Sequence, residues 1–102
     1  MTDHTYDFEW DSKKADSNAR KHGVTFEQAA TVFKDGLALT VFDSTHSEVD
    51  ERWFTLGYAS NGALLALAHT FQALSDATAR IRIISDRPAS KQERLFYADD
   101  PR

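Results

Sequence analysis

The segment Arg80-Ile-Arg-Ile carries two arginines whose spacing is suited to binding a phosphate group. Side chains alternate between the two faces of a β-strand, so Arg80 and Arg82 would point to one face and Ile81 and Ile83 to the other. Two neighbouring guanidinium groups offer a fork of N–H donors that matches the oxygens of a phosphate. The alternative interpretation is a solvent-exposed strand face whose arginines pair with Asp or Glu across the sheet.

A second cationic pair, Lys21-His22, stands directly before Gly23. Cations in the last turn of a helix interact favourably with the helix dipole, by about 0.3–1 kcal/mol, and this alone would explain the pair. The functional alternative is that Lys21 neutralises a phosphate while His22 transfers a proton, because imidazole titrates near neutral pH. In that case this helix end and the arginine-bearing strand must converge on one water-accessible hollow.

The other candidate residues lie in the second half of the chain. Arg52 enters a predicted strand, where it would form an ion pair or bind phosphate. His69 shares a strand face with Leu65 and Leu67, which favours a hydrogen-bonded core or edge histidine over a catalytic base. His46 lies in an acidic loop whose spacing matches no strong metal-ligand pattern, so we expect no metal site. The remaining candidates surround the last predicted helix: Arg87, Lys91, Glu93, Arg94 and Tyr97, the last of which is also a candidate core residue.

Motifs of several common enzyme classes are absent from the sequence. It contains no nucleotide-binding glycine loop, dinucleotide fingerprint, serine nucleophile elbow or zinc-ligand pattern, and it has no cysteine. What remains is acid–base and electrostatic chemistry from lysine, histidine, arginine and tyrosine. Cleavage of an RNA phosphodiester bond without a metal needs such a set: a base for the ribose 2′-hydroxyl, an acid for the leaving 5′-oxygen and cations for the phosphorane.

Length and composition suit one small globular domain, which we expect to span residues 1–102. The net charge of −4 argues by itself against a nucleic-acid partner, but bases gather at 13–21 and 80–94, which allows a local basic groove. The acidic N-terminal stretch lacks the apolar run of a signal peptide. The longest apolar run, at 63–68, is far shorter than the ~20 residues that cross a bilayer. We therefore expect a cytoplasmic protein with no membrane partner.

Capping signals predict where the helices begin and end. Asp11 is placed to N-cap a first helix, and Gly23 suits the left-handed residue at its end. Thr25 and Gln28 form a capping box for a second helix. A further box, Ser90-x-x-Glu93, opens a last helix that runs to about Tyr97. The sequence thus predicts three helices.

The strands follow from alternating or continuous apolar runs. We expect them at 6–10, 37–42, 53–59, 63–71 and 80–85, with a loop at 72–79. Asn61-Gly62 predicts a tight hairpin between the third and fourth of these. The resulting order, strand–helix–helix–four strands–helix, indicates an α+β fold with an antiparallel sheet of about five strands and segregated helices.

Short motifs also follow one another in a specific order along nearly the whole chain. They are Phe8-Glu9-Trp10-Asp11, Lys14-Ala15, Asn18, Lys21-His22-Gly23-Val24, Phe26-x-x-Ala29-x-x-Val32-Phe33, Asp43, His46-Ser47-Glu48, Glu51-Arg52, Leu56-Gly57, His69-Thr70, Arg82-Ile83-Ile84-Ser85, Arg87, Ala89 and Glu93-x-x-x-Tyr97. Each motif is weak alone, but the ordered set resembles the BrnT family of toxins.

The resemblance implies a RelE-like fold and the toxin role in a type II toxin–antitoxin system. Such toxins are endoribonucleases that inhibit translation and use no cofactor. Their partner is a BrnA-like ribbon-helix-helix antitoxin encoded next door, and the hetero-oligomer of the two proteins contacts operator DNA only through the antitoxin. The alternative is a catalytically weak or inactive homologue that serves as an antitoxin-binding module in operon autoregulation.

The resemblance also implies site residues. Five positions match family motifs and are our catalytic candidates: Lys21, His22, Arg52, Arg82 and Arg87. Two positions in the last helix are second choices, Glu93 and Tyr97, and three further cations are expected to contact RNA, Arg80, Lys91 and Arg94. Lys21, Arg52, Arg82 and Arg87 would hold phosphate, and His22 would supply the acid–base step without a metal.

Overall fold

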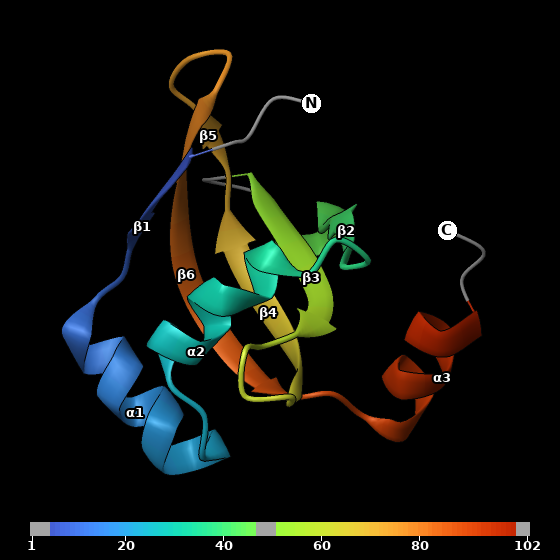
Figure 1. The fold of residues 1–102 in the computed structure, drawn as a ribbon. Coiled ribbons are helices and arrows are strands. Elements are labelled where there is room, and N and C mark those ends of the chain that lie inside the picture. The colour runs from blue at the N-terminus through green and yellow to red at the C-terminus, as the bar shows by residue number, and fades with distance from the viewer. Residues whose placement is uncertain (1–4, 47–50, 100–102) are drawn as a thin grey trace.

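The structure, a computed structural model, describes residues 5–46 and 51–99 as a mixed α+β fold (Figure 1). The strands are β1 (Thr5–Glu9), β2 (Leu39–Phe42), β3 (Arg52–Tyr58), β4 (Leu64–Thr70), β5 (Gln72–Ala73) and β6 (Thr78–Pro88). The helices are α1 (Ser12–His22), α2 (Phe26–Thr31) and α3 (Lys91–Asp99), with short 3-10 helices at Val32–Lys34 and Ser44–His46. No helix in the described ranges is long and apolar enough to span a membrane.

The strands form one sheet in the order β1-β6-β4-β3-β2, and β5 also pairs with β6. The pairs β2–β3, β3–β4, β4–β6 and β5–β6 are antiparallel, as predicted. The pair β1–β6 is parallel, with Glu9 beside Arg82, so the expectation of a fully antiparallel sheet is wrong. Turn signals fix only the pairing of consecutive strands, and β1 is far from β6 in sequence.

The predicted loop at 72–79 is also partly wrong. Gln72 and Ala73 form β5, which pairs with Arg80 and Ala79, and β6 already begins at Thr78. The backbone N–H of Leu74 donates to the carbonyl of Thr78 at 2.9 Å and closes the hairpin. The side chains at these strand ends are small or polar, so no apolar pattern indicates a strand there, although the backbone pairs normally.

The helix ends lie where the capping signals place them. The Asp11 carboxylate accepts from the backbone N–H groups of Lys13 and Lys14, and Gly23 ends α1 with a left-handed φ of 72°. Thr25 and Gln28 form both hydrogen bonds of the capping box, at 3.0 and 3.1 Å. α1 and α2 are therefore joined by a short, fixed connection.

Helices cover the two faces of the sheet unequally. α1 and α2 pack on one face, where the core includes Phe26, Leu67, Ile81 and Ile83. On the other face a smaller cluster gathers under α3 around Leu56, Leu64, Ala66, Ala89 and Tyr97. No helix of the described ranges covers the rest of that second face, and Figure 1 shows α3 set to one side. We call this uncovered part the open face, and it is where the alternation of β6 places Arg80 and Arg82.

A candidate phosphate-binding hollow on the open face

A hollow of about 620 Å³ lies on the open face, where β1, β3, β4 and β6 meet. Its lining comes from five strands, the residue before β3, the start of α1 and the β4–β5 junction: Glu9, Lys14, Glu51, Arg52, Thr70, Phe71, Gln72, Arg82 and Ile84. Strand register explains the convergence, since Arg52 pairs with Thr70 and Glu9 pairs with Arg82. We call it the Arg52–Arg82 hollow.

Arg82 is held at the edge of this hollow by its neighbours. Its backbone N–H donates to Thr70 Oγ1 at 3.2 Å, which ties β6 to the end of β4. Its guanidinium lies 3.9 Å from Glu9 Oε1, and both side chains are about half exposed. Arg80, two residues earlier, pairs with Asp7 at 3.4 Å. Both arginines thus have acidic partners across the sheet, as the alternative interpretation proposed, and Arg82 also lines a hollow open to solvent.

The charges in the hollow suit an anionic ligand and a proton transfer. Three cations, Lys14, Arg52 and Arg82, face two carboxylates, Glu9 and Glu51. Guanidinium groups donate to phosphate oxygens and stabilise charge that develops on them. A carboxylate in the same hollow can accept a proton from a bound hydroxyl group.

Lys21 and His22 do not line this hollow. They form the last turn of α1, at the opposite end of the helix from Lys14. One turn before His22, Asn18 is hydrogen-bonded to Asp86, which lies four residues along β6 from Arg82, a strand length of about 13 Å. The end of α1 therefore packs on β6 beyond the hollow, and Lys21 and His22 do not share the hollow with Arg82 as expected. Their position leaves the helix-dipole interpretation sufficient for both side chains.

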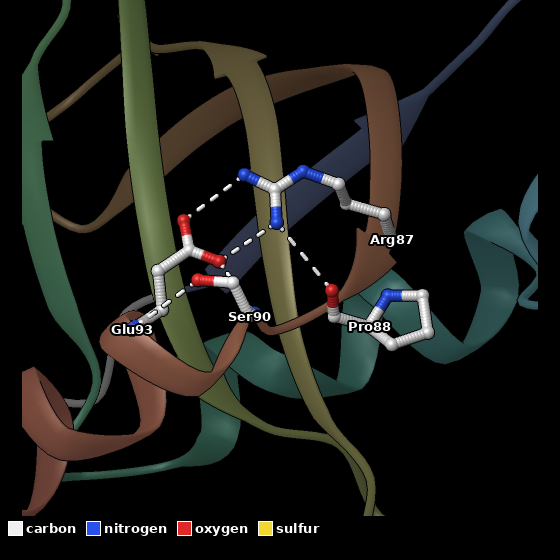
Figure 2. Close-up of polar contacts among 4 residues, drawn as sticks. All are labelled: Arg87, Pro88, Ser90 and Glu93. Atoms are coloured by element: carbon white, nitrogen blue, oxygen red, sulfur yellow. Dashed lines mark hydrogen bonds and ion pairs between the residues drawn. The ribbon is translucent and has the colours of Figure 1, made fainter.

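Arg87 lies beyond the hollow, in a network that fixes the start of α3 (Figure 2). Its Nη1 and Nη2 donate to Glu93 Oε1 and Oε2 at 2.7 and 3.0 Å. Glu93 also closes the predicted capping box, because its Oε1 accepts from the backbone N–H of Ser90 at 2.8 Å. Mainly through the hydrogen bond from Arg87, the network lowers the pKa of Glu93 to about 2. Arg87 and Glu93 thus bind each other in this structure.

The other α3 candidates lie outside the hollow too. Tyr97 is buried, donates its hydroxyl to Asp35 Oδ2 at 2.7 Å and packs edge-on against Tyr58. It belongs to the core, as its apolar neighbours suggested. Lys91 and Arg94 are exposed on α3 and do not line the hollow.

We expect Arg87→Ala to act on stability rather than on RNA cleavage. The bidentate pair is partly exposed, so its loss should cost about 1 kcal/mol, or a few degrees of Tm. Thermal unfolding of Arg87→Ala and Glu93→Gln, alone and combined, measures the coupling between the two side chains. An Arg87→Ala variant that keeps its Tm but loses RNA cleavage would show that Arg87 belongs to the site.

The histidines of the described part of the chain are not grouped with other potential metal ligands. His69 is buried, its Nε2 lies 2.6 Å from Thr55 Oγ1 and its Nδ1 lies 2.9 Å from the carbonyl oxygen of Thr70. Burial lowers its pKa, so it is a neutral core histidine, as predicted. The side chain of His46 lies outside the described residues. Among those that are described, no three His, Cys, Asp or Glu residues are grouped to hold a metal ion.

Sequence reasoning missed several residues of the hollow: Glu9, Lys14, Glu51, Thr70 and Gln72. One signal was present, because Tyr6 and Phe8 alternate with Asp7 and Glu9 just as isoleucines alternate with arginines in 80–83. Matching these two charge patterns would have placed β1 beside β6. Lys14 belongs to the Lys14-Ala15 motif of the family resemblance, and it reaches the hollow because α1 starts at the end of β1.

Comparisons with known proteins agree with this architecture. Residues 10–93 match a protein-family model described as "Ribonuclease toxin, BrnT, of type II toxin-antitoxin system". The structure is similar to the crystal structure of the Brucella abortus ribonuclease toxin BrnT, with a TM-score of 0.57 and 24% sequence identity over 85% of this chain and all of that one. No curated protein sequence matches the chain.

Proposed function

Because this chain belongs to the BrnT family of ribonuclease toxins of type II toxin–antitoxin systems, we propose that it cleaves RNA in the Arg52–Arg82 hollow. The observation that carries the proposal is the convergence of Arg52, Arg82 and Lys14 on one open hollow that also holds carboxylates. RNA brings to such a site a phosphodiester flanked by a 2′-hydroxyl group. Both parts of that substrate have a partner among the hollow's side chains.

The proposed step needs no metal. The 2′-oxygen attacks phosphorus while a carboxylate of Glu9 or Glu51 accepts the hydroxyl proton. Arg52 and Arg82 stabilise the negative charge on the phosphorane oxygens. The bond from phosphorus to the 5′-oxygen then breaks, the leaving oxygen takes a proton from Lys14, and a 2′,3′-cyclic phosphate remains. In this account Lys21, His22 and Arg87 contribute no atom to the reaction, which reassigns the roles first expected for them.

The biological setting follows from the family. The toxin role implies an antitoxin partner. We propose that residues 1–102 form a single RelE-like toxin domain that inhibits translation in the cytoplasm. Its partner is a BrnA-like ribbon-helix-helix protein, and the hetero-oligomer contacts operator DNA through that protein. Arg80, Lys91 and Arg94 are available to guide RNA by charge alone, which makes their contribution strongly dependent on salt.

Incubation of the purified protein with RNA, with and without EDTA, tests this function. We expect cleavage products ending in a 2′,3′-cyclic phosphate, formed at the same rate in both conditions, because only side chains perform the step. Cleavage that EDTA abolishes would contradict the metal-independent mechanism. No cleavage of free RNA or of ribosome-bound RNA would favour the antitoxin-binding module, an alternative consistent with the two carboxylates that offset the charge of the hollow.

A further inference from the structure

Exposed apolar side chains are concentrated on α3, on the β2–β3 hairpin and in the turn before it. Of the eight large apolar residues exposed in the described ranges, six belong to α3, to the β2–β3 hairpin or to the turn before it: Leu37, Val41, Phe42, Tyr58, Leu95 and Phe96. Phe96 and Val41 are 59% and 52% exposed. Concentrated apolar surface of this kind marks sites of protein–protein contact.

This surface contains a groove of about 310 Å³ between α3 and the β2–β3 hairpin. Leu39 and Val41 line one side, Phe54 and Leu56 form the floor, and Phe96 lines the other side with Glu93. β2 stands at the end of the strand order, so the groove lies at the edge of the sheet. Gln92 also lines the groove, but nearly all of the groove surface is apolar, which disfavours RNA and favours apolar side chains of a protein.

The groove and the Arg52–Arg82 hollow are neighbours along β3, which contributes residues to both. Along β3, Arg52, Phe54 and Leu56 alternate onto the same face, so the arginine lies about 7 Å from the floor of the groove. One surface thus offers an apolar groove followed by a cationic hollow. A peptide segment that carries large apolar side chains next to acidic ones complements both parts.

We propose that this groove is the anchor site of the antitoxin. An antitoxin segment buries its apolar side chains between Phe96 and Val41, and its adjoining acidic residues extend over Arg52 into the hollow. The acidic residues of the antitoxin would then occupy the hollow and exclude RNA, while its apolar side chains hold it in the neighbouring groove. The second half of this inference, the blocking, rests on the function proposed above, whereas the anchor does not.

The test is a titration of the purified chain with the antitoxin encoded beside it, measured by calorimetry. Phe96→Ser and Val41→Ser should each weaken binding roughly 30-fold or more, the size typical of an interface hot spot. Leu74→Ser is the matched control, because Leu74 is also exposed, at 44%, but lies on the β5–β6 turn and should change affinity less than about threefold. RNA cleavage by both groove variants should equal that of the wild type, since neither side chain lines the hollow.

Several results would overturn the anchor. One is unchanged antitoxin affinity in both groove variants, and another is a loss confined to Leu74→Ser. A third is a wild-type protein that sediments as a dimer and a Phe96→Ser variant that sediments as a monomer, with equal antitoxin affinity in the two proteins. That result would assign the groove to a second copy of the chain. Weaker RNA binding by Phe96→Ser with normal antitoxin binding would assign it to RNA. If the wild type cleaves no RNA while both groove variants lose antitoxin affinity, the anchor stands and the proposed ribonuclease site falls.

Discussion

Arg82→Gln should lower the rate of RNA cleavage roughly 10²- to 10³-fold with little change in stability. This is the usual cost of removing one preorganised donor that stabilises charge in the transition state. Glutamine keeps much of the side-chain length but loses the charge and the fork of donors. The Arg82 backbone N–H still donates to Thr70, so the sheet should remain intact. Initial rates of cleavage under single-turnover conditions measure the effect.

Arg80→Gln is the matched control for this prediction. Arg80 lies on the same face of β6 and also pairs with a β1 carboxylate, that of Asp7, but it does not line the hollow. We expect its rate within about fivefold of the wild type at moderate salt, because a peripheral cation affects RNA mainly through screened attraction. Equal losses in the two variants would mean that general positive charge, rather than the geometry of the hollow, drives cleavage.

Asp86→Asn should remove a strongly pH-dependent contribution to stability. Asp86 is fully buried; its Oδ1 accepts from Asn18 Nδ2, and its Oδ2 has no partner among the described residues. Burial raises the pKa of Asp86 to about 6, and the charge of Glu27 adds to this effect. The hydrogen bond from Asn18 acts in the opposite direction and lowers the pKa, but its effect is smaller. The ionised carboxylate therefore weakens the fold. Asparagine keeps an acceptor for Asn18 and cannot ionise.

The sign and the pH window follow from the two pKa values of Asp86. The folded state holds this proton more tightly than the unfolded state, whose reference pKa is 3.8. Acidification from pH 7.5 through 6 towards 4 therefore stabilises the wild type relative to Asp86→Asn, by about 2–3 kcal/mol. Buried His69 has the opposite effect, because its lowered pKa means that acidification destabilises the folded state. This contribution is the same in wild type and Asp86→Asn, so it cancels in the difference between their free energies of unfolding.

Urea unfolding of both proteins at pH 7.5, 6, 5 and 4 measures this difference. Asp16→Asn, an exposed substitution on α1, serves as the control and should follow the wild type at each pH. A difference in the free energy of unfolding between wild type and Asp86→Asn that stays constant over this range would show that Asp86 titrates normally. The pair Asn18–Asp86 would then be an ordinary hydrogen bond between α1 and β6.

The local structure of this protein could be predicted from sequence because it depends on neighbouring residues. Asp11, Gly23 and the Thr25–Gln28 box fix the helix ends through hydrogen bonds within a few residues. The Asn61-Gly62 turn brings β3 and β4 together in the same way, with Gly62 at a φ of 86°. The parallel pair β1–β6 joins residues 73 positions apart, and no turn signal reports such a contact.

The candidate site could likewise be predicted only where local strand geometry places its residues. Strand alternation correctly predicts that Arg80 and Arg82 share one face. Arg52 joins Arg82 in the hollow through the register of β3 with β4. The family motif and the chemistry of Lys21 and His22 predict them in the site, but a motif does not give the position of the end of α1 in space. The Asn18–Asp86 contact, which sets that position, is long-range and has no sequence signature.

The α3 candidates illustrate a different limit. The capping box correctly located the start of α3 but did not reveal that Glu93 would also bind Arg87. A charged residue near a predicted site can serve a substrate or a neighbouring element, and only the geometry of the fold distinguishes them. The same holds for Tyr97, whose hydroxyl donates to Asp35, a residue 62 positions earlier in the sequence.

Backbone amide chemical shifts can show whether RNA binds in the Arg52–Arg82 hollow. Isotope-labelled protein would be titrated with a trinucleotide whose 2′-O-methyl groups prevent cleavage. We predict shifts concentrated at Arg52, Thr70, Gln72 and Arg82, with the amides of Lys21, His22 and Gly23 unchanged. Shifts concentrated at the end of α1, with the hollow unaffected, would contradict the account.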